Sequence, residues 1–244
     1  MKSNSPLSNN SREFVKAPIS VPLLIEGNCI EALLVEFNPN HYFDELFEAF
    51  DIHLPDSIKV AVTQRKAEFL AGRHLAGKVM DKHGLGRPRL PINADRRPKW
   101  PSQFTGSISH SKNLAVACGV LPDDPMELGI DVQHKIDESV VKDIKAMVAD
   151  DEELHLMRAF GLAEELAITL LFSAKESIYK AISNKTTSLL DFHSVSLIDI
   201  DNHALTFTSN IKLNLSGHSL DTIHCQYQYL EQYQSCLTFC YVKY

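Results

Sequence analysis

The sequence predicts an α+β fold made of two halves. Residues 19–125 combine helical patterns with a run of short apolar strands, and residues 126–244 combine three helical patterns with a strand-rich C-terminal segment. Runs of strands and runs of helices, rather than a strict alternation of the two, are typical of α+β proteins. A chain of 244 residues fits one large domain or two small ones, and either can bury a sizeable core.

The charge of the chain is unevenly distributed. The formal net charge is −7, yet residues 65–99 hold ten Lys or Arg against three acidic residues, which gives +7 there and leaves −14 for the rest. A basic island in an acidic protein indicates a local site for a polyanion and argues against general nucleic-acid binding. A solvated basic surface without a ligand is an equally open alternative.

Residues 1–18 are rich in Ser and Asn and lack the apolar core of a signal peptide, so we expect a disordered leader. No apolar run approaches the roughly 18–20 residues that span a bilayer. The five cysteines show no CxxC spacing and stand in apolar surroundings, which favours buried free thiols over disulfides or zinc ligands. Together these features favour a cytoplasmic protein that does not span a membrane.

The first half, residues 19–125, begins with a predicted hairpin over 20–37 that turns at Gly27-Asn28. A short helix is expected over 41–50. A long helix is expected from Asp56 or Ser57 to about His83, with Gly84 as its C-terminal stop. A proline-rich loop follows at 85–101, and three strands are predicted at 104–111, 113–120 and 126–133.

The second half, residues 126–244, starts on the last of these strands. Helices are predicted at 140–149, 151–160 and 165–182, the last of which is mostly apolar. The remaining sequence predicts strands at 194–200, 204–215, 222–230 and 235–242. No internal sequence repeat is visible.

A first candidate for chemistry is the segment LGIDVQ, residues 128–133. Because side chains alternate along a strand, its aliphatic residues are expected to face a core, while Asp131 and Gln133 share the other face with Gly129. A glycine leaves the backbone open to close approach. A carboxylate there suits Mg²⁺, which takes one or two carboxylates and completes its shell with water and phosphate. An ordinary surface aspartate on an edge strand is the alternative.

A second candidate is FSAKESIYKA, residues 172–181. Glu176 and Lys180 are four residues apart and share one face of a predicted helix. An exposed ion pair is the common explanation of this spacing, but the preceding LAITLLF indicates a mostly buried helix. A carboxylate and an amine near a core need partners, and a metal–diphosphate would supply them. Glu176 could then bind metal or act as a base, and Lys180 could neutralise phosphate.

A third candidate is GSISHS, residues 106–111, where Ser109 and His110 end a predicted strand. Hydroxyls, an imidazole and backbone N–H groups can bind phosphate oxygens there. The segment does not fit G-x-S-x-G and no acid is obviously placed to orient His110, so a serine hydrolase is disfavoured. A structural histidine is the alternative. Within the basic island, Arg73 and Arg97 could bind phosphates bidentately.

The ordered series RKAEFLAGRHLA, RRPKWP, GSISHS, GIDVQ and FSAKESIYK resembles the 4′-phosphopantetheinyl transferase superfamily, and most of all its siderophore-associated branch. The resemblance covers roughly residues 20–240. It implies a pseudo-dimer of two similar α+β halves with the coenzyme A site between them. It also implies transfer of 4′-phosphopantetheine from coenzyme A to a serine of an apo acyl, peptidyl or aryl carrier protein, for enterobactin-like siderophore synthesis.

The resemblance also implies roles for individual residues. Asp131 and Glu176 align with the family's Mg²⁺ ligands, and Lys180 with the family's lysine after the glutamate. Many members carry a third acidic ligand where this chain has Gln133, whose neutral amide would coordinate Mg²⁺ only weakly. This departure affects the expected metal affinity more than the reaction.

Four positions align with family contacts to coenzyme A. They are Ser109 and His110, which would meet phosphates, together with Arg97 and Arg73. The mechanism expected from the resemblance uses Glu176, or a water that it holds, as the base for the carrier serine, with Lys180 and His110 stabilising phosphate oxygens.

The expected partner is an acidic carrier protein, and the expected oligomeric state is a monomer. Residues 145–165 are a candidate docking segment, with apolar side chains that could equally pack inward: Met147, Leu156, Met157 and Phe160. Two rival functions stay open. A Mg²⁺-dependent nucleotide pyrophosphatase would use the same groups with water as nucleophile, and an inert carrier-binding module would bind without turnover.

Overall fold

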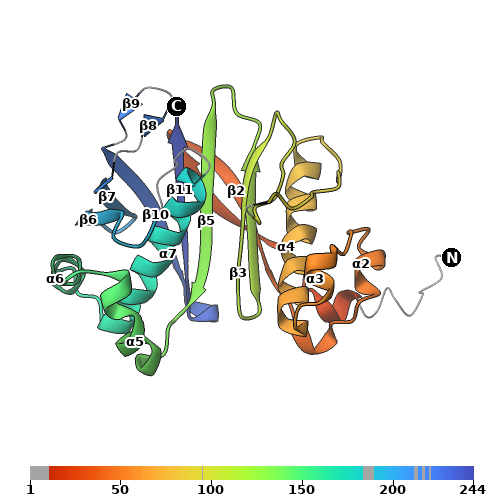
Figure 1. The fold of residues 1–244 in the computed structure, drawn as a ribbon, viewed down its shortest axis with the longest axis horizontal. Helices are drawn as coiled ribbons and strands as arrows, with labels where there is room; N and C mark the ends of the chain where they lie inside the picture. Colours follow the sequence, from red (N-terminus) through yellow and green to blue (C-terminus); the bar gives the residue numbers. More distant parts are fainter. Residues whose placement is uncertain (1–10, 95, 184–189, 212–213, 216–217, 220) are drawn as a thin grey trace. The chain divides into compact units, whose positions relative to one another are not determined.

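A computed structural model of the chain describes residues 11–94, 96–183, 190–211, 214–215, 218–219 and 221–244 (Figure 1). The chain divides into two compact units. The first comprises Met1–Pro22 and Cys29–Leu121, and the second comprises Leu23–Asn28 and Pro122–Tyr244. Each unit packs a long helix against a sheet of antiparallel strands, so the predicted α+β class is confirmed.

The four-stranded sheet belongs mainly to the first unit and has the strand order β1-β2-β4-β3. Its strands are β1 (Ile19–Ile25), β2 (Asn28–Glu36), β3 (Thr105–Ser111) and β4 (Leu114–Val120). The central strand β4 pairs antiparallel with both β2 and β3, with Val116 opposite Leu34 on one side and Ser109 on the other. The strands predicted at 104–111 and 113–120 are therefore present.

The first hairpin turns one residue earlier than predicted. Glu26 and Gly27 have φ angles of 50° and 78°, and Asn28 already begins β2. Two successive positive φ angles are typical of the tight turns whose twist matches that of a hairpin, and glycine adopts them without strain. The hairpin tip groups with the second unit, where the N–H of Leu24 donates to Gln226 Oε1 at 2.9 Å.

The helices of the first unit are shorter than the sequence predicted. The helix expected over 41–50 is limited to a 3-10 turn at Pro39–His41 (η1) and a single α-helical turn at Leu46–Ala49 (α2). The helix expected from Asp56 to His83 is broken into α3 (Asp56–Lys59) and α4 (Thr63–Lys82), because Val62 is extended, with ψ of 154°. Valine is stiff at χ1 and favours extended backbone. The end of α4 is as predicted, with Gly84 at φ 74°.

The expected disordered leader is wrong for its second half. Residues 1–10 lie outside the described residues. Residues 11–14 form a helical turn, the side chain of Phe14 is 1% exposed, and Val15 bridges to Phe37. Phe14 joins a cluster of aromatic rings with Phe37, Tyr42 and Phe50. This apolar contact orders a segment whose composition alone resembles a solvated tail.

The second unit is built on a five-stranded antiparallel sheet with the order β5-β11-β10-β7-β6. Its strands are β5 (Met126–His134), β6 (Val195–Ile200), β7 (Ala204–Ser209), β10 (Thr222–Leu230) and β11 (Ser235–Lys243). The strand expected at 204–215 splits into β7 and the short β8 (Asn214–Leu215), which pairs with β9 (His218–Ser219). Residues 212–213 lie outside the described residues.

Three helices accompany this sheet: α5 (Glu138–Val148), α6 (Asp151–Ala159) and α7 (Glu164–Ile182). All three predicted helices are present. Figure 1 shows α7 lying along one face of the sheet, where its apolar residues join a core with Phe207, Ile223 and Cys225. None of the helices within the described ranges has both the length and the apolar character needed to cross a bilayer.

Candidate active site

The strand β5 and the helix α7 come unusually close at Gly129. A Cβ atom placed on Gly129 would lie 1.8 Å from the carbonyl oxygen of Ser177. Only glycine allows this contact. The open backbone that the sequence suggested is therefore used by α7, rather than being free for a ligand. The contact brings the side chains of α7 next to Asp131, two residues further along β5.

Asp131 is held by two side chains from α7. Lys180 Nζ donates to Asp131 Oδ1 at 2.7 Å and to the carbonyl of Ile130 at 3.0 Å. Ser173 Oγ donates to Asp131 Oδ2 at 2.8 Å. The side chain of Asp131 is 7% exposed and that of Lys180 is 25% exposed. Ser173 and Lys180 are seven residues apart, which is two helical turns, so they lie on the same face of α7. Each of them hydrogen-bonds a different oxygen of the Asp131 carboxylate.

Glu176 lies on α7 between these two residues. Burial raises the pKa of its carboxyl group, Lys180 lowers it, and the negative charge of Asp131 raises it. Desolvation is the largest of these causes. Lys180 thus contacts Asp131 directly, and Glu176 lies near enough to both for their charges to shift its pKa. A cation near Glu176 and Asp131 would relieve both the burial cost and the repulsion between them.

Gln133 is partly exposed, and its Nε2 donates to the carbonyl of His134 at 3.1 Å. No cluster of three or more His, Cys, Asp or Glu suited to a metal occurs among the described residues. The carboxylates that interact here are Asp131 and Glu176, and Mg²⁺ takes one or two carboxylates from a protein when phosphate and water fill its remaining positions. The donor set fits a magnesium ion of this type.

A buried hydroxyl network behind Asp131 was missed by the sequence analysis. Ser173 Oγ lies 3.0 Å from Thr238 Oγ1, and Ser177 Oγ lies 2.7 Å from the same atom. Thr238 stands opposite Asp131 in the pairing of β11 with β5. The spacing of Ser173 and Ser177 on one helical face was the available signal, but their partner Thr238 is about 60 residues away in the sequence and only the fold reveals it.

A pocket of about 230 Å³ opens beside Glu176 within the second unit. Its walls are mostly apolar and include Tyr179, Phe192 and Val195, while Asp191 and Ser194 add polar groups. A narrow apolar pocket with a few polar groups beside a buried carboxylate is a typical small-ligand site. Residues 184–189, which connect α7 to this region, lie outside the described residues.

In the first unit, the face of β3 that carries His110 meets α4. Glu68 Oε2 lies 3.4 Å from His110 Nδ1, and Arg65 donates to His110 Nε2. Glu68 is therefore the acid that orients the imidazole, which the sequence did not reveal. Because an arginine faces Nε2, this histidine is placed for anion binding rather than for activating a serine as in a hydrolase triad.

Arg73 is a largely buried cation of the first unit. Its guanidinium lies 4.7 Å from the ring centroid of Phe69, and its buried Nε has no hydrogen-bond partner in the described part of the chain. Burial, followed by the nearby charge of Arg65, lowers the pKa of Arg73 to about 10. A half-buried arginine with an unsatisfied N–H is suited to an incoming anion.

Arg65, Arg73, Arg96 and His110 line one pocket of about 440 Å³ in the first unit. Ser109 and Arg97, which the sequence grouped with them, are not among its lining residues. Ser109 is 5% exposed, and as a neighbour of His110 on a strand it points to the opposite face of the sheet. The predicted phosphate contacts are therefore only partly brought together.

Both units match models of one protein family. Residues 54–118 match the 4′-phosphopantetheinyl transferase N-terminal domain, and residues 127–238 match the 4′-phosphopantetheinyl transferase superfamily. The candidate residues described for each unit lie within these matches, with Arg65, Arg73 and His110 in the first and Asp131 and Glu176 in the second. The chain belongs to the 4′-phosphopantetheinyl transferase superfamily, and the predicted resemblance is confirmed.

Within this superfamily the chain is similar to enterobactin synthase component D proteins and to a further 4′-phosphopantetheinyl transferase. Enterobactin synthase component D of Salmonella austin is 34% identical over 179 residues, which cover 73% of this chain and 72% of that protein. The Salmonella typhi protein of the same name is 34% identical over 146 residues, 60% of each chain. The transferase Svp of Streptomyces mobaraensis is 33% identical, over 62% of this chain and 61% of that one.

Proposed function

We propose that this protein transfers 4′-phosphopantetheine from coenzyme A to a serine of an apo carrier protein and releases 3′,5′-ADP. The observation that carries the proposal is the arrangement of Asp131, Glu176 and Lys180 around one point of the β5–α7 contact. Two carboxylates and an ammonium group, backed by a buried hydroxyl network, are suited to a diphosphate with its metal ion. They offer little to an uncharged substrate.

Asp131 and Glu176 are the residues that would hold Mg²⁺, and Gln133 could add a weak neutral oxygen ligand. Magnesium bound there would act as a Lewis acid that offsets the negative charge developing on the leaving group. Lys180 now neutralises Asp131 through its 2.7 Å contact. With a diphosphate bound, the same ammonium group would be free to share its N–H donors with phosphate oxygens.

The transfer forms one bond and breaks another. The carrier serine Oγ attacks the β-phosphorus of coenzyme A, the bond from that phosphorus to the bridging oxygen breaks, and 3′,5′-ADP leaves with the electron pair. Glu176, or a water that it holds, accepts the serine proton, for which its raised pKa is suited. In the first unit, His110 and Arg73 would bind phosphate groups of the nucleotide, and Ser109 and Arg97 remain proposed contacts.

The carrier protein would dock on the candidate segment 145–165. Its apolar side chains divide into two groups. Met157 is fully buried and Leu156 packs against the core, so neither is available to a partner. Met147 and Phe160 are 50% and 36% exposed, and we propose that they contact the carrier.

The similarity to enterobactin synthase component D proteins favours a carrier of a siderophore-producing nonribosomal peptide synthase. We expect the protein to act in the cytoplasm as a monomer. Nucleic acid is not an expected partner.

Intact-mass spectrometry of an apo aryl or peptidyl carrier, incubated with this protein, coenzyme A and Mg²⁺, tests the proposal. The carrier should gain one phosphopantetheine. The gain should be lost with a chelator and in Glu176→Gln, while Glu231→Gln, an exposed glutamate far along the chain, should behave as wild type.

The same experiment separates the rival functions. Cleavage of coenzyme A with every carrier unmodified would indicate a pyrophosphatase. Carrier binding with coenzyme A intact and no mass gain would indicate an inert binding module, and either result would overturn the transferase proposal.

A further inference from the structure

Lys175, the residue before Glu176, forms an ion pair deep inside the second unit. Its Nζ lies 2.8 Å from the carboxylate of Glu153 on α6. The two side chains are 2% and 1% exposed, respectively. The transfer mechanism uses neither charge, since the groups placed around the diphosphate are Asp131, Glu176 and Lys180. A buried pair of charges outside the reacting groups therefore needs an explanation of its own.

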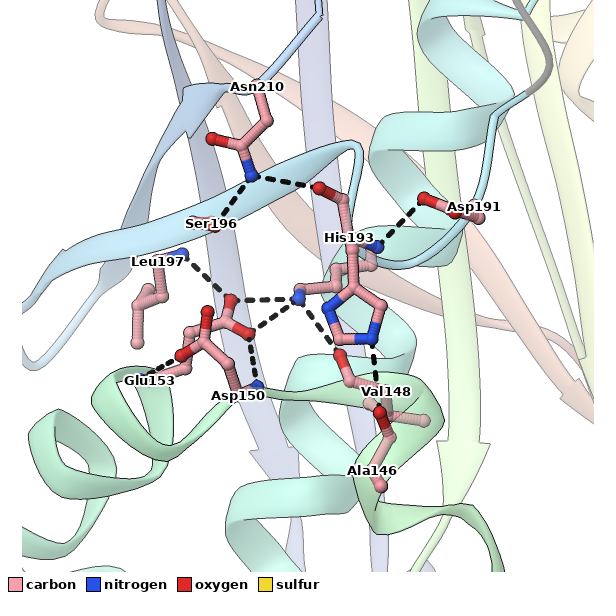
Figure 2. A network of polar contacts seen from close by, with 10 residues as sticks. Ala146, Val148, Asp150, Glu153, Asp191, His193, Ser196, Leu197 and Asn210 are labelled. Atoms are coloured by element: carbon pink, nitrogen blue, oxygen red, sulfur yellow. Dashed lines mark hydrogen bonds and ion pairs between the residues drawn. The ribbon is translucent and has the colours of Figure 1, made fainter.

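The pair lies where four segments meet, α5, α6, β6 and α7, and this meeting point is called the joint (Figure 2). The N–H of Leu197 on β6 donates to Glu153 Oε1 at 2.8 Å, and the N–H of Asp150 donates to Glu153 Oε2 at 3.1 Å. Lys175 Nζ also donates to the carbonyl of Val148, the last residue of α5, at 2.9 Å. Figure 2 shows these groups converging from α5, α6, β6 and α7.

The end of α5 and the start of α6, which meet at this ion pair, are also capped by other hydrogen bonds. Asp150 and Glu153 form a reciprocal capping box at the start of α6. His193 Nε2 meets the carbonyl of Ala146 at 3.1 Å, so side chains from outside α5 reach two carbonyls of its last turn. Glu153 thus serves as both the capping glutamate of α6 and the counter-ion of Lys175, and one side chain fixes the path of the chain from α5 into α6.

A buried ion pair by itself adds little to the free energy of unfolding. Desolvation of both charges offsets much of their attraction, and well-packed apolar residues often do as well. A hydrogen-bonded pair differs from an apolar contact because its geometry is directional. Lys175 therefore adds a directional contact on the α6 side of α7 to those that Ser173 and Lys180 make with Asp131 on the β5 side. Because the helix turns about 100° per residue, any rotation of α7 about its own axis carries the neighbouring carboxylate of Glu176 toward or away from Asp131 on β5.

We propose that the Glu153–Lys175 pair is a positioning device that fixes the rotation of α7 and so holds Glu176 in register with Asp131. This inference rests on the proposed function of Glu176 as a metal ligand. Glu153 and Lys175 are positioning residues, because they act through the helix and touch neither substrate nor metal. The joint also ties the segment proposed to dock the carrier to the helix that bears the proposed base.

The test uses the full-length double variant Glu153→Gln/Lys175→Met. It removes both charges together, keeps similar volumes, and leaves an amide oxygen for the N–H of Leu197. The matched control is Glu138→Gln/Lys142→Met, which removes an exposed ion pair from α5, with side chains 68% and 71% exposed. Circular dichroism and thermal unfolding establish that both variants are folded at the assay temperature.

Two readouts distinguish positioning from a merely structural role. Mn²⁺ binding in the presence of coenzyme A, followed by electron paramagnetic resonance, should weaken about tenfold in the double variant and stay unchanged in the control. The Mg²⁺ concentration for half-maximal transfer should rise similarly, while the KM for coenzyme A stays within about twofold. A merely structural role would reduce the amount of active protein without moving either metal dependence.

The proposal is overturned if the folded double variant binds Mn²⁺ as tightly as wild type. Where the double variant does not fold, Glu153→Asp takes its place, since it keeps the charge and shortens the side chain by one methylene. It should fold and show the same weakening of Mn²⁺ binding. Failure of the proposed function has a different signature, because wild type itself would then neither bind Mn²⁺ with coenzyme A nor modify a carrier.

Discussion

A neutral amide stands at position 133, two residues beyond Asp131 and on the same face of β5. We expect Gln133→Glu to lower the Mg²⁺ concentration for half-maximal activity by about tenfold, which corresponds to about 1.4 kcal/mol of added binding energy. An anionic oxygen binds a hard cation more strongly than an amide oxygen does. Titration of activity with Mg²⁺ measures the change, and Gln103→Glu, an exposed loop substitution, is the control for added charge.

The result that would contradict this expectation is an unchanged Mg²⁺ titration for Gln133→Glu. It would mean that the side chain at position 133 does not reach the metal. The same variant should be less stable without metal, because it adds a third carboxylate near two others.

His74 makes a second residue-scale prediction, which concerns pH. Burial, with smaller contributions from Lys78 and Arg87, lowers the pKa of His74 to about 4, and its ring lies edge-on to Phe50 at 4.6 Å. The unfolded chain binds this proton near pH 6.5, whereas the folded chain does not bind it until about pH 4. Stability should therefore fall as the pH drops through this window, by on the order of 2 kcal/mol from this residue.

Urea unfolding of His74→Gln and wild type at several pH values between these limits measures the effect. The variant should lose the part of the pH slope that His74 supplies. Parallel slopes for the two proteins would contradict the assignment.

Single residues also show where prediction from the sequence ends. Asp131, Glu176 and Lys180 were predicted because each stands in a pattern with a local meaning: strand alternation in one case and helical spacing in the other. Glu68 and Glu153 were missed as partners of His110 and Lys175, since those partners lie in distant elements. The local capping box of Asp150 and Glu153 marks only the start of α6. Ser109 shows a different limit, because adjacent residues of a strand point to opposite faces, so Ser109 and His110 do not share a face of β3 and the contact of Ser109 with coenzyme A stays a prediction.

Among the secondary-structure elements, the candidate site depends most directly on the contact between β5 and α7, which brings Asp131 next to Lys180. Gly129→Ala should destabilise the protein by about 3 kcal/mol or more and reduce transfer, because the new Cβ would meet the backbone carbonyl of Ser177 and push α7 away from Asp131. Urea unfolding at constant m-value measures the first effect and the mass assay measures the second.

Gly77→Ala is the matched control for this substitution. A Cβ on Gly77 would make only ordinary contacts, at 3.6–3.8 Å from the Arg87 side chain, and alanine favours the helix by about 1 kcal/mol. We expect this variant to be as stable as wild type or more so. Equal behaviour of the two alanine variants would refute the role of the Gly129 contact.

Elements were predicted best where the hydrophobic period was long and uninterrupted. The helix over 164–182 and most strands of the second sheet follow directly from their patterns, the exception being the strand predicted at 204–215, which ends at Ser209. The helix expected from residue 56 to 83 did not, because the break at 60–62 carries no proline or glycine and only the extended backbone at Val62 reveals it. Val60 and Val62 are 87% and 74% exposed, so no packing pattern could have marked the interruption.

For the whole molecule, the distribution of charged residues indicated an anionic ligand, but it did not indicate which of these residues lie together in a site. The basic island over 65–99 indicated a polyanion, and the structure gathers part of it around one pocket: Arg65, Arg73 and Arg96. Arg87 and Arg89 line a neighbouring pocket of about 700 Å³ that also includes Arg73, and Arg87 faces Asp81 at 3.6 Å. The net charge of a segment does not depend on where each side chain lies. Binding of an anion depends on how many of these side chains line the same pocket.

The distribution of charge leads to a prediction about ionic strength. Coenzyme A is highly anionic, and the rest of the protein is strongly acidic, so binding depends on a local basic field within a repulsive one. The KM for coenzyme A should rise about tenfold as salt increases from about 0.05 to about 0.5 M, because the Debye length shrinks to a few ångströms. The kcat should change less than about twofold, since the groups around Asp131 are buried and little screened.

Arg96→Gln separates local attraction from the overall field. It removes one exposed charge that lines the pocket, so the plot of log KM against log salt concentration should become shallower. Lys99→Gln removes an equal, exposed charge that lines neither this pocket nor the neighbouring one, and its slope should match wild type. Equal slopes in all three proteins would show that net charge governs binding; a shallower slope for Arg96→Gln alone would place the nucleotide in the pocket that Arg65, Arg73 and His110 share with it.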